Sequence, residues 1–125
     1  MKTTLQKSIE AYKLINNLNS VRMKSTATSR KLFSLKKLLE PNFEFYAEEE
    51  RKLIADLGGT VTEDGAILFP DQENGLKQLA DGRRELLATE CDIPIDTPII
   101  FHDSEGVQVS GDEIAILDGL ADFKE

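Results

Sequence analysis

The chain has 125 residues, of which 40% are hydrophobic and 6% aromatic. This length supports one hydrophobic core, and no window of about 18 residues is apolar throughout, so we expect a single domain over 1–125 and no membrane-spanning segment. The net charge of −8 combines two opposite parts: residues 1–37 carry nine basic side chains against one acidic, whereas the remaining 88 residues carry six basic against 22 acidic. The first part is therefore +8 and the rest −16.

The N-terminal residues and the cysteine content bear on the compartment. Cys91 is the single cysteine and forms no internal disulfide. No apolar segment follows the basic N-terminus as it would in a secretory signal. We therefore expect a reducing environment and a cytoplasmic protein without a membrane partner.

Residues 5–18 predict a helix whose apolar positions cover more than half of its circumference. These positions are Leu5, Ile9, Ala11, Tyr12, Leu14, Ile15 and Leu18. So wide an apolar face needs two neighbours in the same chain, or one neighbour and a partner chain. Leu5, Ile9 and Tyr12 are therefore candidate interaction residues.

Residues 25–57 predict a long helix with a heptad-like seam. Steps of four and three residues connect Thr28, Leu32, Leu35, Leu39, Asn42, Tyr46, Glu49, Leu53 and Asp56. Pro41 interrupts the seam, because proline removes one backbone hydrogen bond and crowds the preceding turn. Pro41 either kinks one helix or begins another, and both possibilities are open at this point. Gly58 and Gly59 end the helix.

Residues 60–69 predict a β-hairpin around Asp64-Gly65. A third helix is expected after Pro70-Asp71, with an apolar stripe about 120° wide. Gly75 and Gly82 each weaken this helix by about 1 kcal/mol relative to alanine. The third helix must therefore depend on tertiary packing.

Residues 93–101 alternate in the manner of a strand, and Pro94 and Pro98 lie on the same side of it, which indicates an edge strand. We expect a short companion strand at Val107 and Val109. Ser110 and Glu113 form a capping-box pattern at the start of a last helix containing Ile114, Leu117 and Ala121.

The expected fold class is α+β. A helical hairpin or bent coiled coil over 4–57 would form an arm. The body, 60–125, would supply a small antiparallel β-sheet and two further helices. No linker or internal repeat divides the chain.

Catalytic and metal-binding patterns are missing from the sequence. His102 and Cys91 are single residues of their type, whereas a metal site needs several such ligands at close spacing. No phosphate-binding loop or nucleophile motif occurs. We predict no enzyme activity, no metal and no cofactor. Cys91 is expected to be a half-buried core residue, and Arg83, inside an apolar stripe, to pair with a carboxylate.

The basic part of the second helix has three interpretations. Its residues are Lys24, Arg30, Phe33, Lys36 and Lys37. They can be a nucleic-acid footprint, with Phe33 stacked on a base. They can be a protein interface, with Phe33 as anchor and the cations as rim. In the third interpretation Phe33 packs beneath the first helix and the lysines face the acidic second half of the chain.

The sequence therefore predicts a non-enzymatic interaction or assembly protein that binds itself or a partner through the apolar faces of 5–18 and 32–57. The candidate residues are Leu5, Ile9, Tyr12, Lys24, Arg30, Phe33, Lys36, Lys37 and Tyr46. Nucleic-acid binding by the basic residues is an alternative. A second alternative is an acidic decoy, in which the −16 part mimics nucleic acid and inhibits a host nuclease.

Three segments show a family resemblance: 48–58 (EEERKLIADLG), the turn Asp64-Gly65, and 98–117 (PIIFHDSEGVQVSGDEIAIL). There the chain resembles a family of small uncharacterised proteins encoded by tailed bacteriophages and prophages of Gram-positive bacteria. The resemblance implies a phage or prophage origin and a host-cytoplasm setting. It assigns no catalytic or binding residue.

Overall fold

The structure, a computed structural model, describes residues 1–20, 25–102 and 105–124. Within these residues, four helices and three two-stranded ladders form an α+β fold, which confirms the predicted fold class. In chain order the elements are β1 (Lys2–Thr4), α1 (Leu5–Ser20), α2 (Thr26–Asp56), β2 (Thr60–Val61), β3 (Ile67–Leu68), α3 (Gln72–Leu87), β4 (Glu90–Asp92), β5 (Ile99–His102), α4 (Gly111–Ile116) and β6 (Ala121–Lys124).

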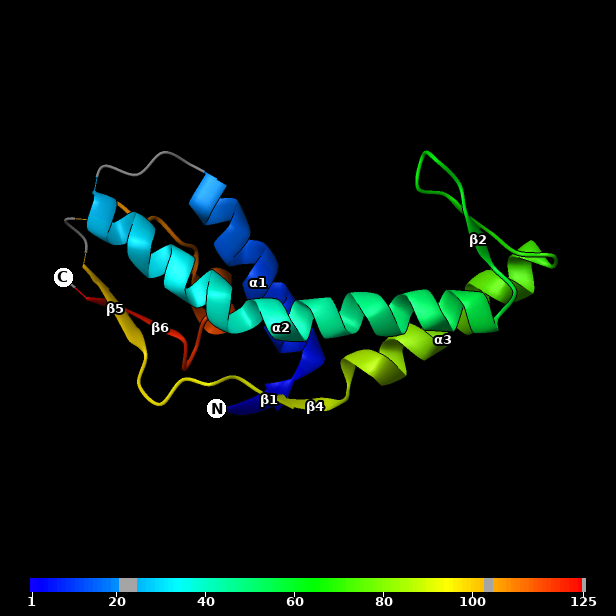
Figure 1. Cartoon of the computed structure of the whole chain (residues 1–125). Coiled ribbons are helices and arrows are strands. Elements are labelled where there is room, and N and C mark those ends of the chain that lie inside the picture. Colours follow the sequence, from blue (N-terminus) through cyan, green and yellow to red (C-terminus); the bar gives the residue numbers. More distant parts are fainter. Residues whose placement is uncertain (21–24, 103–104, 125) are drawn as a thin grey trace.

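Helix α2 is one continuous helix with Pro41 inside it. Pro41 therefore does not begin a new helix. Its missing N–H removes the bond to the carbonyl of Lys37, and packing on both sides of this point keeps the helix continuous. In Figure 1 the cyan first half and the green second half of α2 run in different directions.

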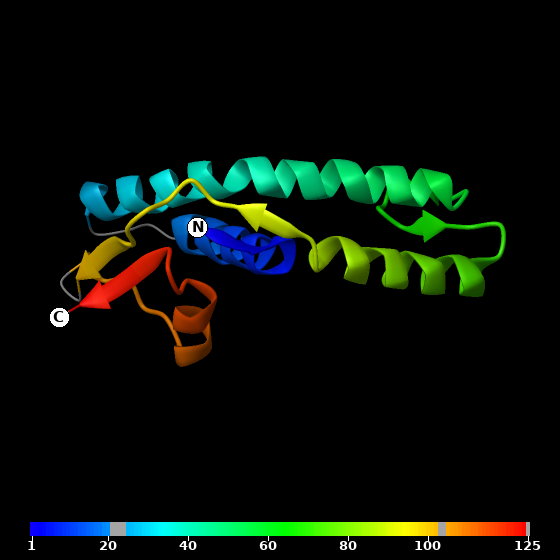
Figure 2. The same cartoon turned by 90° about the horizontal axis from the view of Figure 1, so that it is seen from below.

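Two hydrophobic cores lie along α2, and we name the parts around them the proximal and distal regions. The proximal region combines the first half of α2 with α1, β5, α4 and β6, and the distal region combines the second half of α2 with α3 and the β2–β3 hairpin (Figures 1 and 2). The buried proximal core comprises Ala11, Ile15, Leu32, Leu35, Leu39, Ile93, Phe101, Leu117, Leu120 and Ala121. The buried distal core comprises Ile54, Phe69 and Leu79. The expected arm, 4–57, and body, 60–125, thus contribute to both cores.

The distal region follows the sequence-based prediction closely. β2 and β3 pair as an antiparallel hairpin, with Val61 opposite Ile67. The Asp71 side chain caps α3 by accepting a 3.3 Å hydrogen bond from the backbone N–H of Asn74. A Cβ at Gly75 would lie 2.3 Å from Cγ of Phe69. The glycine that weakens α3 as a helix former is therefore required for its contact with the hairpin.

Strand β1 was not predicted. It pairs with β4 in an antiparallel ladder, with Thr3 opposite Cys91. The chain turns directly from β1 into α1, where Thr4 Oγ1 accepts a 3.3 Å hydrogen bond from the backbone N–H of Lys7. Three residues of each strand make this ladder, which is too short to produce a hydrophobic alternation in the sequence.

The predictions for the C-terminal segment require three corrections. Of the strand expected over 93–101, only Ile99 to Phe101 are in a strand, and β5 extends to His102. Its partner is β6 rather than Val107 and Val109, and the pair is parallel. The antiparallel sheet expected here is thus three separate ladders, two of them antiparallel and one parallel.

The last helix is shorter than expected, although its predicted capping box is present. Ser110 Oγ accepts from the backbone N–H of Glu113 at 3.2 Å, and the Glu113 side chain accepts from the Ser110 N–H at 2.8 Å. Helix α4 ends at Ile116, and Ala121, expected in this helix, begins β6. The return at Gly119, where φ is +81°, lets the chain run back along β5.

Candidate functional site

Two of the predicted interaction residues are in the interior of the chain. Leu5 is 1% exposed and Ile9 is 4% exposed, so neither offers a surface to a partner, which corrects the prediction. The seam residues Leu35 and Leu39 are likewise fully buried. The wide apolar faces of α1 and α2 pack against each other and against the C-terminal strands. Residues of the same chain therefore cover both faces.

Tyr12 is half-buried and stacks on Phe43, with 4.3 Å between the ring centroids. This contact joins α1 to α2 and covers one face of the Tyr12 ring. Lys24, another predicted residue, lies outside the described residues.

The opposite side of α2 forms a continuous exposed face, which we call the outer face of α2. In Figure 2, α2 runs nearly straight along one border of the molecule, with the other elements on its far side. The helical period of 3.6 residues places the members of this face on the side away from Leu35 and Leu39. From Arg30 to Glu48 the exposed residues of this face are Arg30, Phe33, Ser34, Lys37, Pro41, Glu44, Phe45 and Glu48.

Phe33 and Phe45 are the large apolar side chains of the outer face. Phe33 is 52% exposed and Phe45 is 50% exposed. The interpretation in which Phe33 packs beneath the first helix is therefore wrong. Large aromatic side chains that a helix leaves half-exposed can act as anchors of a binding surface.

Basic side chains surround Phe33. The Lys37 Nζ lies 5.5 Å from the centroid of the Phe33 ring and 3.4 Å from Glu40 Oε2. Arg30 is exposed one helical turn before Phe33, and Lys36 is half-buried beside it. The structure thus brings Arg30, Phe33 and Lys37 together on one surface, as the sequence indicated.

Lys31 connects the basic helix to the acidic second half of the chain. Its Nζ lies 2.7 Å from Glu105 Oε1 and donates to the Ile100 carbonyl at 2.8 Å. Glu105 also accepts from the buried Thr28 hydroxyl at 3.1 Å and from the His102 backbone N–H at 2.6 Å. The hydrogen bond from Lys31, aided by these donors, lowers the pKa of Glu105. The polar seam residue Thr28 is therefore a docking point for the C-terminal segment.

Tyr46 belongs to a hydrogen-bonded group in which α2 and α3 meet. Its hydroxyl donates to Glu50 Oε2 at 2.9 Å, and the Arg83 Nε donates to the same oxygen at 3.0 Å. Burial, together with the bond to Glu50, raises the pKa of Tyr46. The prediction that Arg83 pairs with a carboxylate is confirmed. Tyr46 thus has a partner within the chain.

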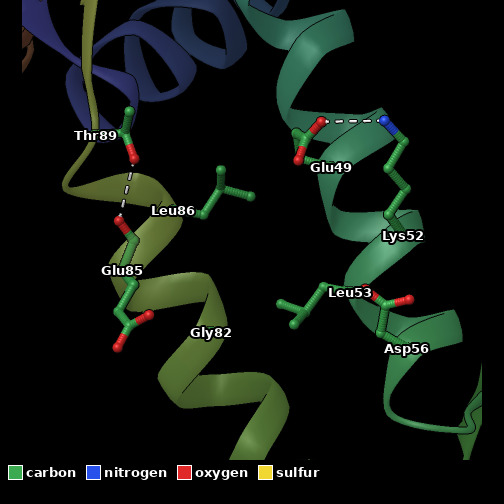
Figure 3. Close-up of a pocket in the computed structure, with 8 residues that line it drawn as sticks. All are labelled: Glu49, Lys52, Leu53, Asp56, Gly82, Glu85, Leu86 and Thr89. Carbon is green, nitrogen blue, oxygen red and sulfur yellow. Dashed lines mark hydrogen bonds and ion pairs between the residues drawn. The ribbon is translucent and has the colours of Figure 1, made fainter.

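An open hollow of about 380 Å³ lies between α2 and α3. Figure 3 shows Leu53 and Leu86 pointing toward one another across it, with Glu49, Lys52, Asp56 and Glu85 at its rim. Lys52 Nζ lies 3.4 Å from Glu49 Oε1. Gly82 forms part of the wall, where a Cβ would lie 2.6 Å from the Leu53 side chain. The charged rim residues face solvent, and the hollow holds no convergent set of catalytic groups.

The described residues contain no group of three His, Cys, Asp or Glu side chains arranged to hold a metal ion. Cys91 is half-buried on β4, as predicted, and burial raises the pKa of its thiol. His102 is exposed at the end of β5, and its backbone N–H donates a hydrogen bond to the Glu105 carboxylate. In the part of the chain that the structure describes, no helix is sufficiently long and apolar to span a membrane.

No protein-family model matches the chain, and no curated protein or solved structure matches it significantly. The resemblance to phage and prophage proteins therefore stays a prediction, and the surface of the molecule is the basis for inferring function.

Sequence reasoning did not include the acidic half of the outer face. Glu44, Phe45 and Glu48 lie outside the heptad seam, as Phe33 does. The same signal that selected Phe33, an aromatic residue off the apolar stripe, also applies to Phe45.

Proposed function

We propose that the protein is a non-enzymatic interaction or assembly protein that binds protein surfaces through the outer face of α2. The observation that carries this proposal is the exposure of Phe33 between Arg30 and Lys37. Binding interfaces are dominated by a few aromatic and arginine side chains at their centre. We also propose a cytoplasmic location, in the host if the gene belongs to a phage, because the one cysteine is a free thiol.

The outer face suits protein binding better than nucleic-acid binding. A nucleic-acid footprint needs cations along its whole length to neutralise phosphates. Here the exposed acidic residues Glu44 and Glu48 interrupt the cations of this face, between Lys37 and the exposed Arg51 and Lys52. The acidic part would repel a nucleic-acid backbone that followed the helix.

Photo-crosslinking in cells that express the gene tests the proposal. A photoreactive residue at Phe33 should give one or a few defined protein adducts, whereas the same residue at the exposed Glu63 of the β2–β3 hairpin should not. Each adduct is then rebuilt from purified components, where Phe33→Ala should weaken the complex at least tenfold, because removing an interface anchor costs about 2 kcal/mol.

Two results would contradict the proposal. One is the same adduct pattern from both positions, or no complex from purified components. The other is a mobility shift of DNA or RNA at about 50 mM salt that weakens steeply as salt rises and is lost in Arg30→Glu, which would favour nucleic-acid binding.

A further inference from the structure

The outer face of α2 is complementary to itself. We propose that its partner is a second copy of this chain, bound with the two α2 helices antiparallel around a two-fold axis near Leu39. This inference rests on the proposed function and names its partner. A two-fold interface uses the same patch on both copies, so each contact must occur twice.

The spacing of the outer-face residues fits this symmetry. Phe33 and Phe45 lie six residues before and after Leu39, and Arg30 and Glu48 lie nine residues before and after it. In an antiparallel pair centred on residue 39, Arg30 lies at the level of the partner's Glu48. Phe33 lies at the level of the partner's Phe45. The pair of Arg30 with the partner's Glu48 therefore forms twice.

The helical period places the same residues correctly around the helix. Arg30 and Glu48 share one line along α2, and Phe33 and Phe45 lie about 60° to either side of it at 100° per residue. The charged pairs would therefore lie at the centre line of the contact. The two-fold axis would place Phe33 of both copies along one flank and Phe45 of both copies along the other. The two halves of α2 run in different directions in Figure 1 but nearly straight along the border in Figure 2, so the bend does not point toward or away from the side on which a second helix would lie.

The charges favour an antiparallel pair over a parallel one. Between Arg30 and Glu48 the outer face is basic before Leu39, at Arg30 and Lys37, and acidic after it, at Glu44 and Glu48. A parallel pair would place like charges opposite each other, which costs free energy and disfavours that arrangement.

Neighbouring ion pairs do not prevent the contact. Glu48 pairs with Arg51 one turn away, and Lys37 lies 3.4 Å from Glu40. Exposed pairs of this kind contribute little to stability, so they can exchange partners at low cost. Glu48 keeps a second carboxylate oxygen for an arginine of another copy.

The contact is small. The helix segment from Arg30 to Glu48 is about 27 Å long at 1.5 Å per residue. A single helix pair of this length buries less than a standard interface of roughly 1,600 Å², so we expect a dissociation constant in the micromolar range.

Charge reversal tests the pairing in solution, with sedimentation velocity up to about 200 µM protein to resolve micromolar association. The wild-type chain should dimerise reversibly. Arg30→Glu and Glu48→Arg should each weaken the dimer at least tenfold, because each variant sets like charges opposite each other at both ends. A 1:1 mixture of the two variants should restore dimers, since every charged pair is then again opposite in sign. Lys77→Glu, at an exposed position on α3, is the matched control and should dimerise like wild type.

Disulfide trapping tests the register. In a Cys91→Ser background, the double variant Arg30→Cys/Glu48→Cys should form a covalent dimer on mild oxidation. The two positions lie about 27 Å apart within one chain, so the bond can only join two copies. Arg30→Cys alone should not form it, because the two copies of residue 30 lie at opposite ends of the antiparallel pair.

The outcomes separate this inference from the proposed function. A wild-type chain that stays monomeric, or a mixture that fails to restore dimers, overturns self-pairing. A covalent dimer of Arg30→Cys alone overturns the antiparallel register. If purified complexes with another protein still depend on Phe33, the proposed function stands without self-pairing. If Phe33→Ala affects no complex, both fail.

Discussion

The proximal and distal regions share one helix and are held together in different ways. The proximal core buries ten side chains contributed by both ends of the chain, whereas the distal core buries three. In the distal region, neighbouring elements approach each other closely at two glycines. Gly75 lies against Phe69, and Gly82 lies against Leu53. A small core can thus be stable when glycines let its elements come into direct contact, but it tolerates little added volume.

The two regions also differ in their polar contacts. In the proximal region Glu105 accepts hydrogen bonds from Thr28, Lys31 and the His102 backbone. In the distal region the main connection is the half-exposed pair of Arg83 and Glu50, at 3.0 Å. Because exposed pairs contribute little, we expect the proximal region to set global stability and the distal region to open at lower free energy.

The largest effect is expected from Leu35→Ala in the proximal core. Leu35 is fully buried, so truncation should lower the free energy of unfolding by about 3 kcal/mol through lost contacts and a residual cavity. Urea denaturation followed by circular dichroism measures it. The adjacent exposed change Ser34→Ala is the control and should stay within about 0.5 kcal/mol of wild type. A loss below about 1 kcal/mol for Leu35→Ala would contradict the placement of the main core.

A smaller and local effect is expected from Gly75→Ala in the distal region. The added Cβ would overlap Phe69 and should cost about 2 kcal/mol, although alanine favours a helix. Hydrogen exchange should show faster exchange in the hairpin and α3, with α1 unchanged. Gly111→Ala, where nothing lies within 4 Å of the new Cβ, should leave both regions unchanged. Equal loss of protection in α1 would show that the two regions unfold as one.

The smallest effect is expected from Glu105→Gln, at about 1–2 kcal/mol near neutral pH. The Lys31 hydrogen bond lowers the pKa of Glu105 below its ordinary value of 4.5, so the carboxylate stabilises the fold above that pH. This stabilisation is lost as the pH falls through the lowered pKa, because the folded state must then take up a proton. Urea denaturation from pH 7 to about pH 3 should show the two proteins converging. A difference that stays constant over this range would exclude Glu105 as its source, and Glu63→Gln in the hairpin turn is the control.

Local signals predicted the parts of the fold that depend on neighbouring residues. The heptad steps of α2, the Asp64-Gly65 turn, the capping by Asp71 and the Ser110 box all act within one or two turns of the chain. Such features can be predicted from the sequence because the interacting groups are close together along the chain.

The missed elements depend on distant partners. β1 forms only because β4, some 90 residues later, lies beside it, and β6 becomes a strand because β5 offers a parallel edge. The residues of β6, Ala121 to Lys124, show no strand alternation that would distinguish them from the end of a helix. In the structure these residues pair with β5, and the Phe101 and Phe123 rings stack across the pair with 5.6 Å between their centroids.

The sequence predicted only the basic half of the candidate surface. Arg30, Phe33 and Lys37 stand out in the sequence because an aromatic residue among cations is unusual off an apolar stripe. Leu5 and Ile9 were assigned to the same surface because periodicity shows that a face is apolar but not what covers it. The structure buries both side chains within the chain.

The sequence by itself determined the helical periods, the caps, the hairpin turn and the division of charge into +8 and −16. Only the tertiary structure decided that the oppositely charged parts share one core, that Lys31 meets Glu105, and that the outer face of α2 stays uncovered. The reason is that periodicity and capping are local properties of the backbone. Which apolar face meets which, and which charge finds a partner, depends on side chains that are far apart in the chain.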